Sequence, residues 1–390
     1  MQMACSSSSW ILTRPLRAVS HRLDLLLRRS EAEPIRSSHT FRIPRSRLMS
    51  EQSLQDQHAN RQNLGLVDAR ASVSSVGAED HADHSSWVAI LLCSMHGQHF
   101  IAEQLESIMA QTHARWTVWV SDDGSEDDTH QIINLYLAKW GPDRISIRPG
   151  PSKGYAANFL SLTRQEIIQA RYYAYADQDD VWEPDKLSRA VEWLNTVPAD
   201  IPALYCSRTR LIDQQGREIG FSPLIRWPPS FANALVQNIS GGNTIVFNEA
   251  TRNLLREIPE DIGIVAHDWL AYQLVTGCGG RVHFDPYPSV RYRQHCSNLI
   301  GSKNGWRNKL WRMKRFLGGQ FRHWNDVNIQ ALRGIFRKLT PDNQRTLDHF
   351  SAARNRSLIP RIVGIWRSGV HRQSFLENLG LCVGVLVKRV

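Results

Sequence analysis

The amino-acid sequence predicts an α/β fold with a mostly parallel central sheet flanked by helices. Short apolar runs, beginning with residues 88–93, alternate with helical patterns through the middle of the chain. Polar clusters follow three of these runs, at residues 94–97, 122–125 and 177–180. Because α/β proteins bind ligands at the carboxyl ends of their strands, we expect the functional site at this edge of the sheet.

Three parts are predicted along the 390 residues. Residues 1–85 are rich in Ser, Arg and Gln, which is typical of a disordered or targeting segment. An alternative for this extension is a translation start placed too early, with Met49 as the true initiator. Residues 86–302 are expected to form the α/β domain, and residues 303–390 a basic helical C-terminal extension.

The first half of the α/β domain is predicted to alternate strands and helices. Strands are expected at residues 88–93, 116–120 and 144–147, and helices at residues 101–109 and 129–139. The first helix has apolar residues at Ile101, Leu105, Ile108 and Met109, at the spacing of an amphipathic helix. Strand–helix–strand units of this kind are built with parallel strands.

The segment Tyr175-Ala176-Asp177-Gln178-Asp179-Asp180-Val181-Trp182 is the most informative in the chain. Its three carboxylates repel one another, and a hard divalent cation removes that cost by accepting their oxygens as ligands. A strand is predicted at residues 171–176 and a helix from Glu183, with Pro184 in its first turn. The alternative is a solvated acidic turn, but the flanking elements favour a site at the sheet edge.

A second acidic cluster, Asp122-Asp123-Gly124-Ser125, follows the second predicted strand. Ser125 or Asp127 can cap the next helix, and Gly124 can make the turn. These structural roles leave the adjacent pair Asp122 and Asp123 unexplained. A carboxylate at this position can accept the N–H of a pyrimidine ring.

Residues 87–302 resemble inverting family 2 glycosyltransferases with the GT-A fold, nearest to their rhamnosyltransferase-like branch. The resemblance is carried by a set of motifs in a fixed order: Cys93-Ser94-Met95-His96-Gly97, Glu103-Gln104-Leu105, Asp122-Asp123-Gly124-Ser125, Gly154-Tyr155-Ala156-Ala157-Asn158-Phe159, Asp177-Gln178-Asp179-Asp180-Val181-Trp182, His267-Asp268-Trp269 and Tyr292-Arg293-Gln294-His295. Many relatives have Thr-Tyr-Asn-Gly where this chain has Ser94-Met95-His96-Gly97, which removes an aromatic surface for the base.

The resemblance implies a nucleotide-sugar donor site at the strand ends. Its expected donor-binding residues are Ser94, His96, Glu103, Asp123, Asp177 and Arg293. Within this set, Ser94, His96 and Asp123 would hold the nucleobase. Asp177 would contact the ribose or sugar, and Arg293 the diphosphate.

The resemblance also implies a Mg²⁺ or Mn²⁺ ion that bridges the two phosphates of the donor. Its expected ligands are Asp179 and His295. The ion would neutralise charge that grows on the departing nucleoside diphosphate. An ordinary polar loop residue is the alternative for His295.

Asp268 is the expected catalytic base, which would take the proton of the acceptor hydroxyl during a single displacement. Trp269 beside it would desolvate the carboxylate and raise its pKa. The alternative for Asp268 is a cap on a helix at residues 269–274. The acceptor side is expected to comprise Gly241, Gly242, Asn243 and Trp269, although Gly241-Gly242 can also be no more than a tight turn before a strand at residues 245–247.

Charge and composition narrow the partners. The net charge is +10, and residues 306–390 contain 17 Lys and Arg against 4 Asp and Glu. Aromatic residues alternate with these basic residues between Trp306 and Trp324, which suits an anionic membrane surface; the alternative is that they pack on the catalytic domain. Nucleic acid is not expected as a partner, because the acidic motifs repel phosphate and no nucleic-acid-binding signature is present.

The six cysteines form no C-x-x-C pair, which favours a reducing compartment and argues against a structural zinc site. No run of 18 apolar residues occurs, so no transmembrane helix is predicted. Together these features predict a cytoplasmic enzyme, peripheral on the inner face of the membrane.

The predicted function is metal-dependent, inverting transfer of L-rhamnose from dTDP-rhamnose to a cell-surface polysaccharide or a lipid-linked acceptor. A first alternative is the same chemistry with a UDP-hexose donor. A second is a non-catalytic homologue that binds glycans or membranes.

Overall fold

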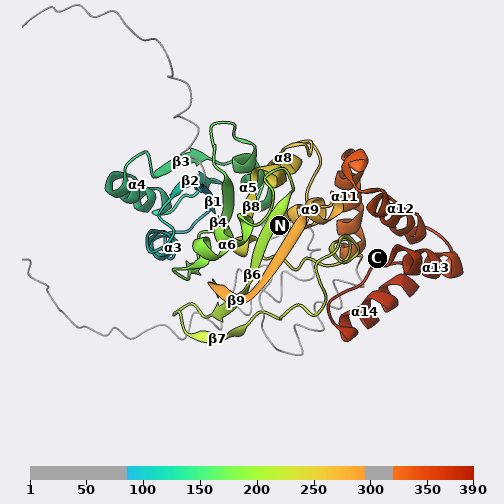
Figure 1. The fold of residues 1–390 in the computed structure, drawn as a ribbon. Coiled ribbons are helices and arrows are strands. Elements are labelled where there is room, and N and C mark those ends of the chain that lie inside the picture. The colour runs from blue at the N-terminus through green and yellow to red at the C-terminus, as the bar shows by residue number, and fades with distance from the viewer. Residues whose placement is uncertain (1–85, 295–318) are drawn as a thin grey trace, which may run out of the picture. The chain divides into compact units, whose positions relative to one another are not determined.

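The computed structural model describes residues 86–294 and 319–390, and its described part centres on a nine-stranded sheet (Figure 1). The strands follow the order β3-β2-β1-β4-β8-β6-β9-β5, with β7 paired to β6. Their bounds are β1 Val88–Ser94, β2 Trp116–Asp122, β3 Ile145–Pro149, β4 Tyr172–Asp177, β5 Val181–Trp182, β6 Ala203–Ile212, β7 Glu218–Phe221, β8 Val246–Asn248 and β9 Arg281–Arg293.

Helices cover both faces of this sheet, which confirms the α/β fold class. The helices of the α/β part are α3 Ile101–Met109, α4 Thr129–Trp140, α5 Tyr155–Arg164, α6 Lys186–Leu194, α7 Phe231–Ala234, η3 Gly242–Thr244, α8 Glu249–Arg256 and α9 His267–Gly277. They are followed by α11 Gln320–Gly334, η4 Phe336–Lys338, α12 Pro341–Arg354, α13 Leu358–Ser368 and α14 Phe375–Leu386. No helix in these described ranges has the length and apolarity needed to cross a membrane.

The strands β3, β2, β1 and β4 are parallel, as the alternating pattern predicts, whereas β8, β5 and β7 pair antiparallel with their neighbours. All seven residues of β1 are buried. Its alternate side chains enter different hydrophobic clusters on the two faces of the sheet: Ala89 and Leu91 on one face, Val88 and Ile90 on the other. Burial on both faces explains why this strand is a continuous apolar run.

The strand register brings the polar clusters together. Ser94 at the end of β1 lies opposite Asp122 of β2, and Cys93 lies opposite Asp177 of β4. The carboxyl ends of three parallel strands therefore meet at one edge of the sheet, where the sequence predicted the site.

One predicted helix begins later than expected. The helix after the acidic motif starts at Lys186 rather than at Glu183, and Pro184 lies before its N-cap, Asp185. The reason is that Val181 and Trp182 pair with Arg291 and Val290 of β9 as a short strand. This long-range pairing competes with the local helix signal.

The C-terminal helices share a hydrophobic core with the α/β part. Phe321 of α11 is 8% exposed, and its ring stacks on Trp269 of α9 at 6.4 Å between centroids. Trp324 meets the same indole edge-on at 6.5 Å. These two aromatic residues pack on the α/β domain, whereas Trp306, Trp311 and Phe316 lie outside the described residues.

Candidate active site

Four carboxylates influence one another at the edge of the sheet. Asp177 ends β4, Asp179 and Asp180 follow in the loop to β5, and Asp268 lies in the first turn of α9. Burial, followed by the charges of Asp179 and Asp268, raises the pKa of Asp177 to about 8. The sheet therefore gathers several carboxyl groups at one place, and their mutual repulsion when ionised would be relieved by a bound cation.

Asp180 connects three segments around this site. It is fully buried, and its Oδ2 accepts a hydrogen bond of 2.5 Å from Nδ2 of Asn243. Its Oδ1 accepts the backbone N–H of Arg293 at 3.2 Å. Burial and the charges of Asp179 and Asp177 raise the pKa of Asp180 well above its usual range. Asp180 thus ties the acidic loop to η3 and β9, and it does not cap the following helix.

Asp268 is held by backbone donors while remaining partly exposed. Its Oδ1 accepts the N–H of Trp269 at 2.7 Å, and its Oδ2 accepts the N–H of Gly242 at 3.1 Å. Burial raises the pKa of Asp268 to about 6, against the opposing effect of these hydrogen bonds. The carboxylate is ionised at neutral pH and can accept a proton. The N-cap of α9 is Ala266, so Asp268 supports the first turn without being the capping residue.

His267 is a core histidine in this structure. It is 3% exposed and stacks on Phe159 at 4.0 Å between ring centroids. Neither ring nitrogen has a hydrogen-bond partner in the described part of the chain, and burial lowers the pKa of His267 to about 3. The imidazole is therefore neutral, and it contributes packing beneath Asp268.

The segment predicted for the acceptor side lies directly against Asp268. A Cβ on Gly242 would come within 2.8 Å of Nε2 of His267, so glycine allows this backbone to approach α9. Asn243 faces Asp180, and Gly241 is exposed. The indole of Trp269 is 6% exposed and donates to the carbonyl of Ala234 at 2.6 Å, so its ring belongs to the core.

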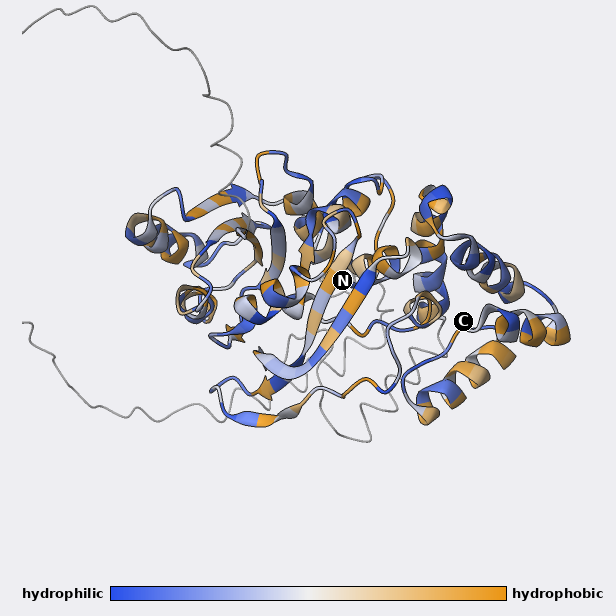
Figure 2. Ribbon diagram, in the orientation of Figure 1, coloured by the Kyte–Doolittle hydropathy of each residue, from blue (hydrophilic) through white to orange (hydrophobic). Residues whose placement is uncertain are grey.

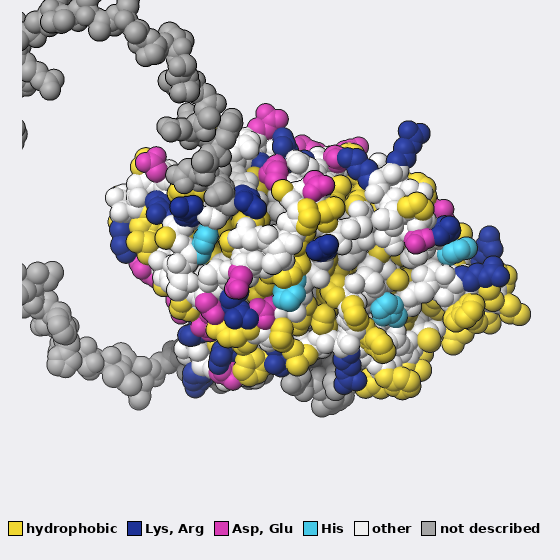
Figure 3. Space-filling view, in the orientation of Figure 1, with side chains coloured by type: hydrophobic (Ala, Val, Ile, Leu, Met, Phe, Trp, Pro, Cys, Tyr) yellow, Lys and Arg dark blue, Asp and Glu magenta, His cyan; other side chains and the backbone are white. Residues whose placement is uncertain are grey.

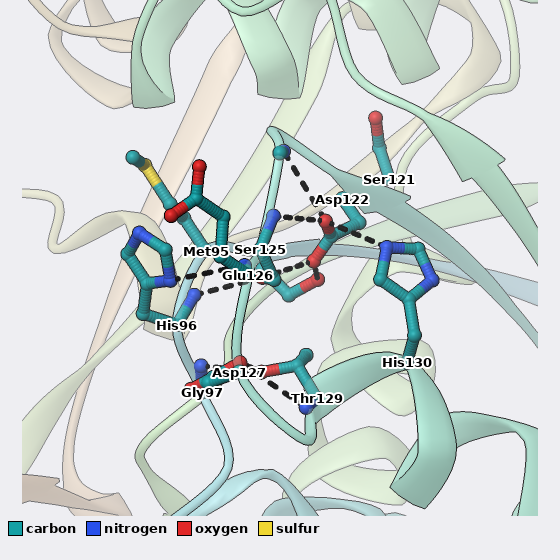
Figure 4. A network of polar contacts seen from close by, with 12 residues as sticks. Met95, His96, Gly97, Ser121, Asp122, Ser125, Glu126, Asp127, Thr129 and His130 are labelled. Carbon is teal, nitrogen blue, oxygen red and sulfur yellow. Dashed lines mark hydrogen bonds and ion pairs between the residues drawn. The ribbon is translucent and has the colours of Figure 1, made fainter.

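Asp122 organises the ends of β1 and β2 (Figure 4). Its carboxylate accepts hydrogen bonds from the hydroxyls of Ser94 at 2.7 Å and Ser125 at 2.6 Å, and His130 lies 3.0 Å away. Burial acts to raise the pKa of Asp122, but hydrogen bonds from Ser125 and Ser94 bring it below its usual value. The Ser94 hydroxyl is thus held by Asp122, which is a partner that the sequence did not indicate.

His96 protrudes from this network with a positive φ of 54°. Its backbone N–H donates to Oγ of Ser125 at 2.8 Å, and its exposed ring accepts the N–H of Glu126 at 3.4 Å. Between His96 and the acidic loop, the side-chain amide of Gln178 forms two hydrogen bonds to the backbone of Met95 at 2.8 and 2.9 Å. These contacts hold the His96 turn beside Asp177.

Asp123 shapes the loop that leads into α5. Its oxygens accept the N–H of Ser152 at 2.6 Å and of Gly154 at 3.1 Å. A Cβ on Gly150 would meet Oδ1 of Asp123 at 2.7 Å, so this loop approaches the carboxylate closely. Asp123 is only 8% exposed, and its role in binding a nucleobase stays a prediction.

Arg293 and Glu103 form an ion pair beside the acidic loop. The guanidinium of Arg293 donates to Oε2 of Glu103 at 2.5 Å, to the carbonyl of Asp179 at 3.0 Å and to that of Gln214 at 3.1 Å. Arg293 is 2% exposed. These hydrogen bonds let Arg293 fix the backbone of Asp179. A donor diphosphate would have to pass this loop to contact the guanidinium of Arg293.

Three residues of the site were absent from the sequence prediction. Gln178 joins the acidic loop to β1, and its place inside the acidic motif was the available signal. Asn238 hydrogen-bonds Asp268, and Tyr155 lies against His267 and donates to the carbonyl of Val265 at 3.1 Å. Tyr155 belongs to the motif at residues 154–159, whereas Asn238 has no sequence signal; the fold alone brings both segments to Asp268.

The side chains at the acidic loop provide only some of the ligands that a hard cation needs. Among the described residues, no group of three or more His, Cys, Asp or Glu side chains is arranged to hold a metal ion. His295, the second expected ligand, lies outside those residues. Asp179 and the neighbouring acids supply oxygen ligands, which Mg²⁺ and Mn²⁺ prefer. Oxygens of the bound donor would therefore have to supply the remaining ligands of such a site.

Comparison with known proteins identifies the α/β domain. Residues 89–253 match the family model described as glycosyl transferase family 2. The chain is 26% identical over 231 residues to dTDP-rhamnosyl transferase RfbG of Shigella flexneri, which covers 57% of this chain and 78% of that protein. It is also 27% identical over 107 residues to the UDP-Glc:alpha-D-GlcNAc-diphosphoundecaprenol beta-1,3-glucosyltransferase WfgD of Escherichia coli, covering 27% of this chain and 40% of that protein.

Solved structures also resemble this chain in fold. Residues 1–349 of S. aureus TarS match with a TM-score of 0.44 at 14% identity, covering 73% of this chain and 92% of that one. The mannosyltransferase PcManGT from Pyrobaculum calidifontis, solved with GDP-Man and Mn²⁺, matches with a TM-score of 0.42 at 16% identity, covering 77% and 85%.

Proposed function

The chain is a glycosyltransferase with a family 2 domain, and from this premise we propose that it transfers L-rhamnose from dTDP-rhamnose with inversion at the anomeric carbon. The observation that carries the proposal is the position of Asp268. The carboxylate of Asp268 is partly exposed to solvent, has a raised pKa and lies beside the acidic loop. Such a group suits general-base catalysis near neutral pH.

In the proposed reaction, an acceptor hydroxyl attacks the anomeric carbon of the donor sugar. A new C–O bond forms as the bond to the diphosphate oxygen breaks, and the nucleoside diphosphate leaves with the electron pair. Asp268 accepts the hydroxyl proton. Gly242 and Trp269 keep its carboxylate oriented through their backbone N–H groups.

Donor binding is assigned to the edge formed by β1, β2 and β4. Asp123 and the His96 turn would bind the base, with Ser94 and Glu103 supporting them, and Asp177 would contact the sugar side. Arg293 holds the loop at Asp179 through the carbonyl of that residue. The carboxyl oxygens of Asp177 and Asp123 accept hydrogen bonds, so a donor rich in N–H and O–H groups fits this edge.

Mg²⁺ or Mn²⁺ is proposed as the cofactor, held by Asp179 and His295 together with diphosphate oxygens. When bound, the ion would stabilise negative charge on the departing diphosphate. The mutual repulsion of the neighbouring carboxylates favours a cation at this place. The protein residues orient the donor around it.

The similarity to a dTDP-rhamnosyl transferase supports dTDP-rhamnose as the donor. A UDP-hexose is the second candidate, because another relative is named as a UDP-glucose enzyme. That name also includes a diphosphoundecaprenol acceptor, which supports a lipid-linked glycan as the acceptor here. We therefore place the enzyme at the cytoplasmic face of the membrane.

A thermal-unfolding panel tests the donor assignment. A ligand that binds only the folded state raises the unfolding temperature, so dTDP-rhamnose with Mn²⁺ is expected to raise it more than UDP-glucose, UDP-galactose or dTDP alone. EDTA is expected to remove most of the effect. An equal or larger shift with a UDP-hexose would exclude the dTDP-rhamnose assignment, and no shift with any nucleotide sugar would argue for a non-catalytic homologue.

A further inference from the structure

The helices α13 and α14 expose many large apolar side chains. Large apolar side chains lie on their outer faces at helical spacing: Ile359, Ile362 and Trp366 on α13, and Leu376, Leu379 and Val383 on α14. Trp366 is 79% exposed and Leu376 is 76% exposed. A helix on the surface of a water-soluble protein normally turns its apolar stripe toward the core. The exposed stripes of α13 and α14 therefore indicate a binding partner.

The inner face of the same helix pair combines apolar side chains, such as Leu381 and Val385 of α14, with a buried arginine. Arg361 of α13 is only 4% exposed, and its guanidinium donates to the carbonyl of Val385 at 2.7 Å and to that of Leu386 at 3.2 Å. A buried arginine thus holds α13 on the C-terminal end of α14. Because these hydrogen bonds join α13 to α14, the outer apolar stripes cannot turn inward without breaking them.

The apolar surface continues onto a loop of the catalytic domain. Gln373, between α13 and α14, accepts the N–H groups of Arg226 and Trp227 at 2.8 Å each and donates to the carbonyl of Trp227. Trp227 is 59% exposed, and Leu224 is 50% exposed. Hydrophobic side chains gather over α13, α14 and the neighbourhood of β7 along one side of the molecule (Figure 3), and Figure 2 shows the same apolar character along α14.

The charge around this surface selects its partner. From residue 355 to the C-terminus, Glu377 is the single acidic residue, and its carboxylate accepts hydrogen bonds from Ser374 and Gln237. Exposed basic residues border the apolar stripes: Arg356, Arg367, Lys388 and Arg389. Apolar side chains with tryptophan, bordered by Lys and Arg, match the boundary between acyl chains and anionic headgroups.

We propose that α13, α14 and the loop at residues 224–227 dock this protein on an anionic phospholipid bilayer. This surface is joined to the acceptor side, because the loop leads into α7, where Ala234 accepts the indole N–H of Trp269 next to Asp268. Docking would present the base to a hydroxyl held close to the headgroups. This inference rests on the proposed function in one respect: it takes the acceptor to be lipid-linked.

Co-sedimentation of the full chain with lipid vesicles tests the surface. The wild-type protein is expected to bind vesicles of phosphatidylcholine and phosphatidylglycerol, and to bind pure phosphatidylcholine vesicles more weakly. The double variant Trp366→Ser/Leu376→Ser is expected to weaken binding by roughly tenfold for each side chain removed. Arg367→Gln/Lys388→Gln is expected to weaken binding to the anionic vesicles by roughly fivefold per charge and to reduce its salt dependence.

A matched control removes apolar side chains of similar exposure from the α/β part. Leu135 and Ile167 are 70% and 62% exposed, and Leu135→Ser/Ile167→Ser should bind vesicles like the wild type. All these side chains are exposed, so the variants should unfold at nearly the wild-type temperature. Equal vesicle binding by Trp366→Ser/Leu376→Ser and the wild type would overturn the proposal.

Two further readouts separate the alternatives. If the wild type fails to bind vesicles and forms a dimer that Trp366→Ser/Leu376→Ser dissociates, the surface is a self-association site and the membrane proposal is wrong. The donor-dependent thermal shift is measured without lipid. Loss of vesicle binding with that shift retained supports the docking surface, whereas vesicle binding without any donor shift supports docking and contradicts the proposed transfer reaction.

Discussion

At the scale of single residues, Asp268 combines two properties that a general base needs. Backbone N–H groups of Trp269 and Gly242 fix its carboxylate, and burial raises its pKa to about 6. A base with this pKa is ionised at neutral pH yet holds a proton better than a solvated aspartate.

Replacing Asp268 with Asn is expected to reduce the transfer rate by roughly 10²–10⁴-fold, because the amide cannot accept the proton. The donor-induced thermal shift should remain. In the wild type, the rate should rise with pH through about 6 and then level off, since only the ionised carboxylate is active. Steady-state rates across pH check this, with the exposed Glu192→Gln as the control; an unchanged rate for Asp268→Asn would exclude the assignment.

His267 makes a second prediction at this scale, on stability. Burial lowers its pKa from 6.5 to about 3 in the folded state. The unfolded chain therefore binds a proton first as the pH falls, so the contribution of His267 to stability is complete above 6.5 and is lost progressively toward about pH 3.

The variant His267→Phe keeps a ring to stack on Phe159 and has no group to titrate. Its free energy of unfolding should fall less between pH 7 and pH 4 than that of the wild type, as measured by urea unfolding. The exposed His349→Gln should keep the wild-type profile. Identical profiles for His267→Phe and the wild type would show that the imidazole is not buried as described.

At the scale of elements, α11 joins the C-terminal helices to the catalytic domain. Leu332 of α11 is fully buried in the same cluster as Leu270 and Leu274 of α9. Phe321 and Trp324 cover the indole of Trp269 from the other side of that cluster. The helix that contains Asp268 is therefore supported by residues that follow its end by more than forty positions in the sequence.

Leu332→Ala should lower the free energy of unfolding by about 2–5 kcal/mol, because it leaves a cavity in this shared core. Since the cluster spans both parts, the variant should still unfold in one transition. Leu135→Ala removes a side chain that is 70% exposed and should change stability by less than about 0.5 kcal/mol. Separate unfolding of the C-terminal helices, followed by calorimetry, would contradict a shared core.

At the scale of the whole molecule, charge and apolar surface are segregated. The acidic residues of the site lie at one edge of the sheet, whereas the basic residues concentrate in the C-terminal region. A donor diphosphate would be repelled by the carboxylates without a cation, and an anionic membrane would attract the opposite end of the chain. This separation would allow one chain to combine the proposed nucleotide-sugar binding with the proposed membrane docking.

Sequence alone determined the fold class and the edge of the sheet at which the site lies. Continuous apolar runs such as residues 88–93 occur because a central parallel strand is buried on both faces, so the signal is local. The polar clusters at Ser94, Asp122 and Asp177 follow such runs directly, and parallel strands bring their ends together. The motifs in their order also predicted the glycosyltransferase domain that the family comparison confirms.

Only the tertiary structure decided which groups donate hydrogen bonds to each carboxylate. Asn243 and Arg293 reach Asp180 across 63 and 113 residues, and no local pattern encodes such pairings. The same holds for the two C-terminal aromatics, Phe321 and Trp324, which pack on Trp269, and for the outward apolar faces of α13 and α14. Periodicity shows that a helix is amphipathic, but which side meets the core depends on what packs against it.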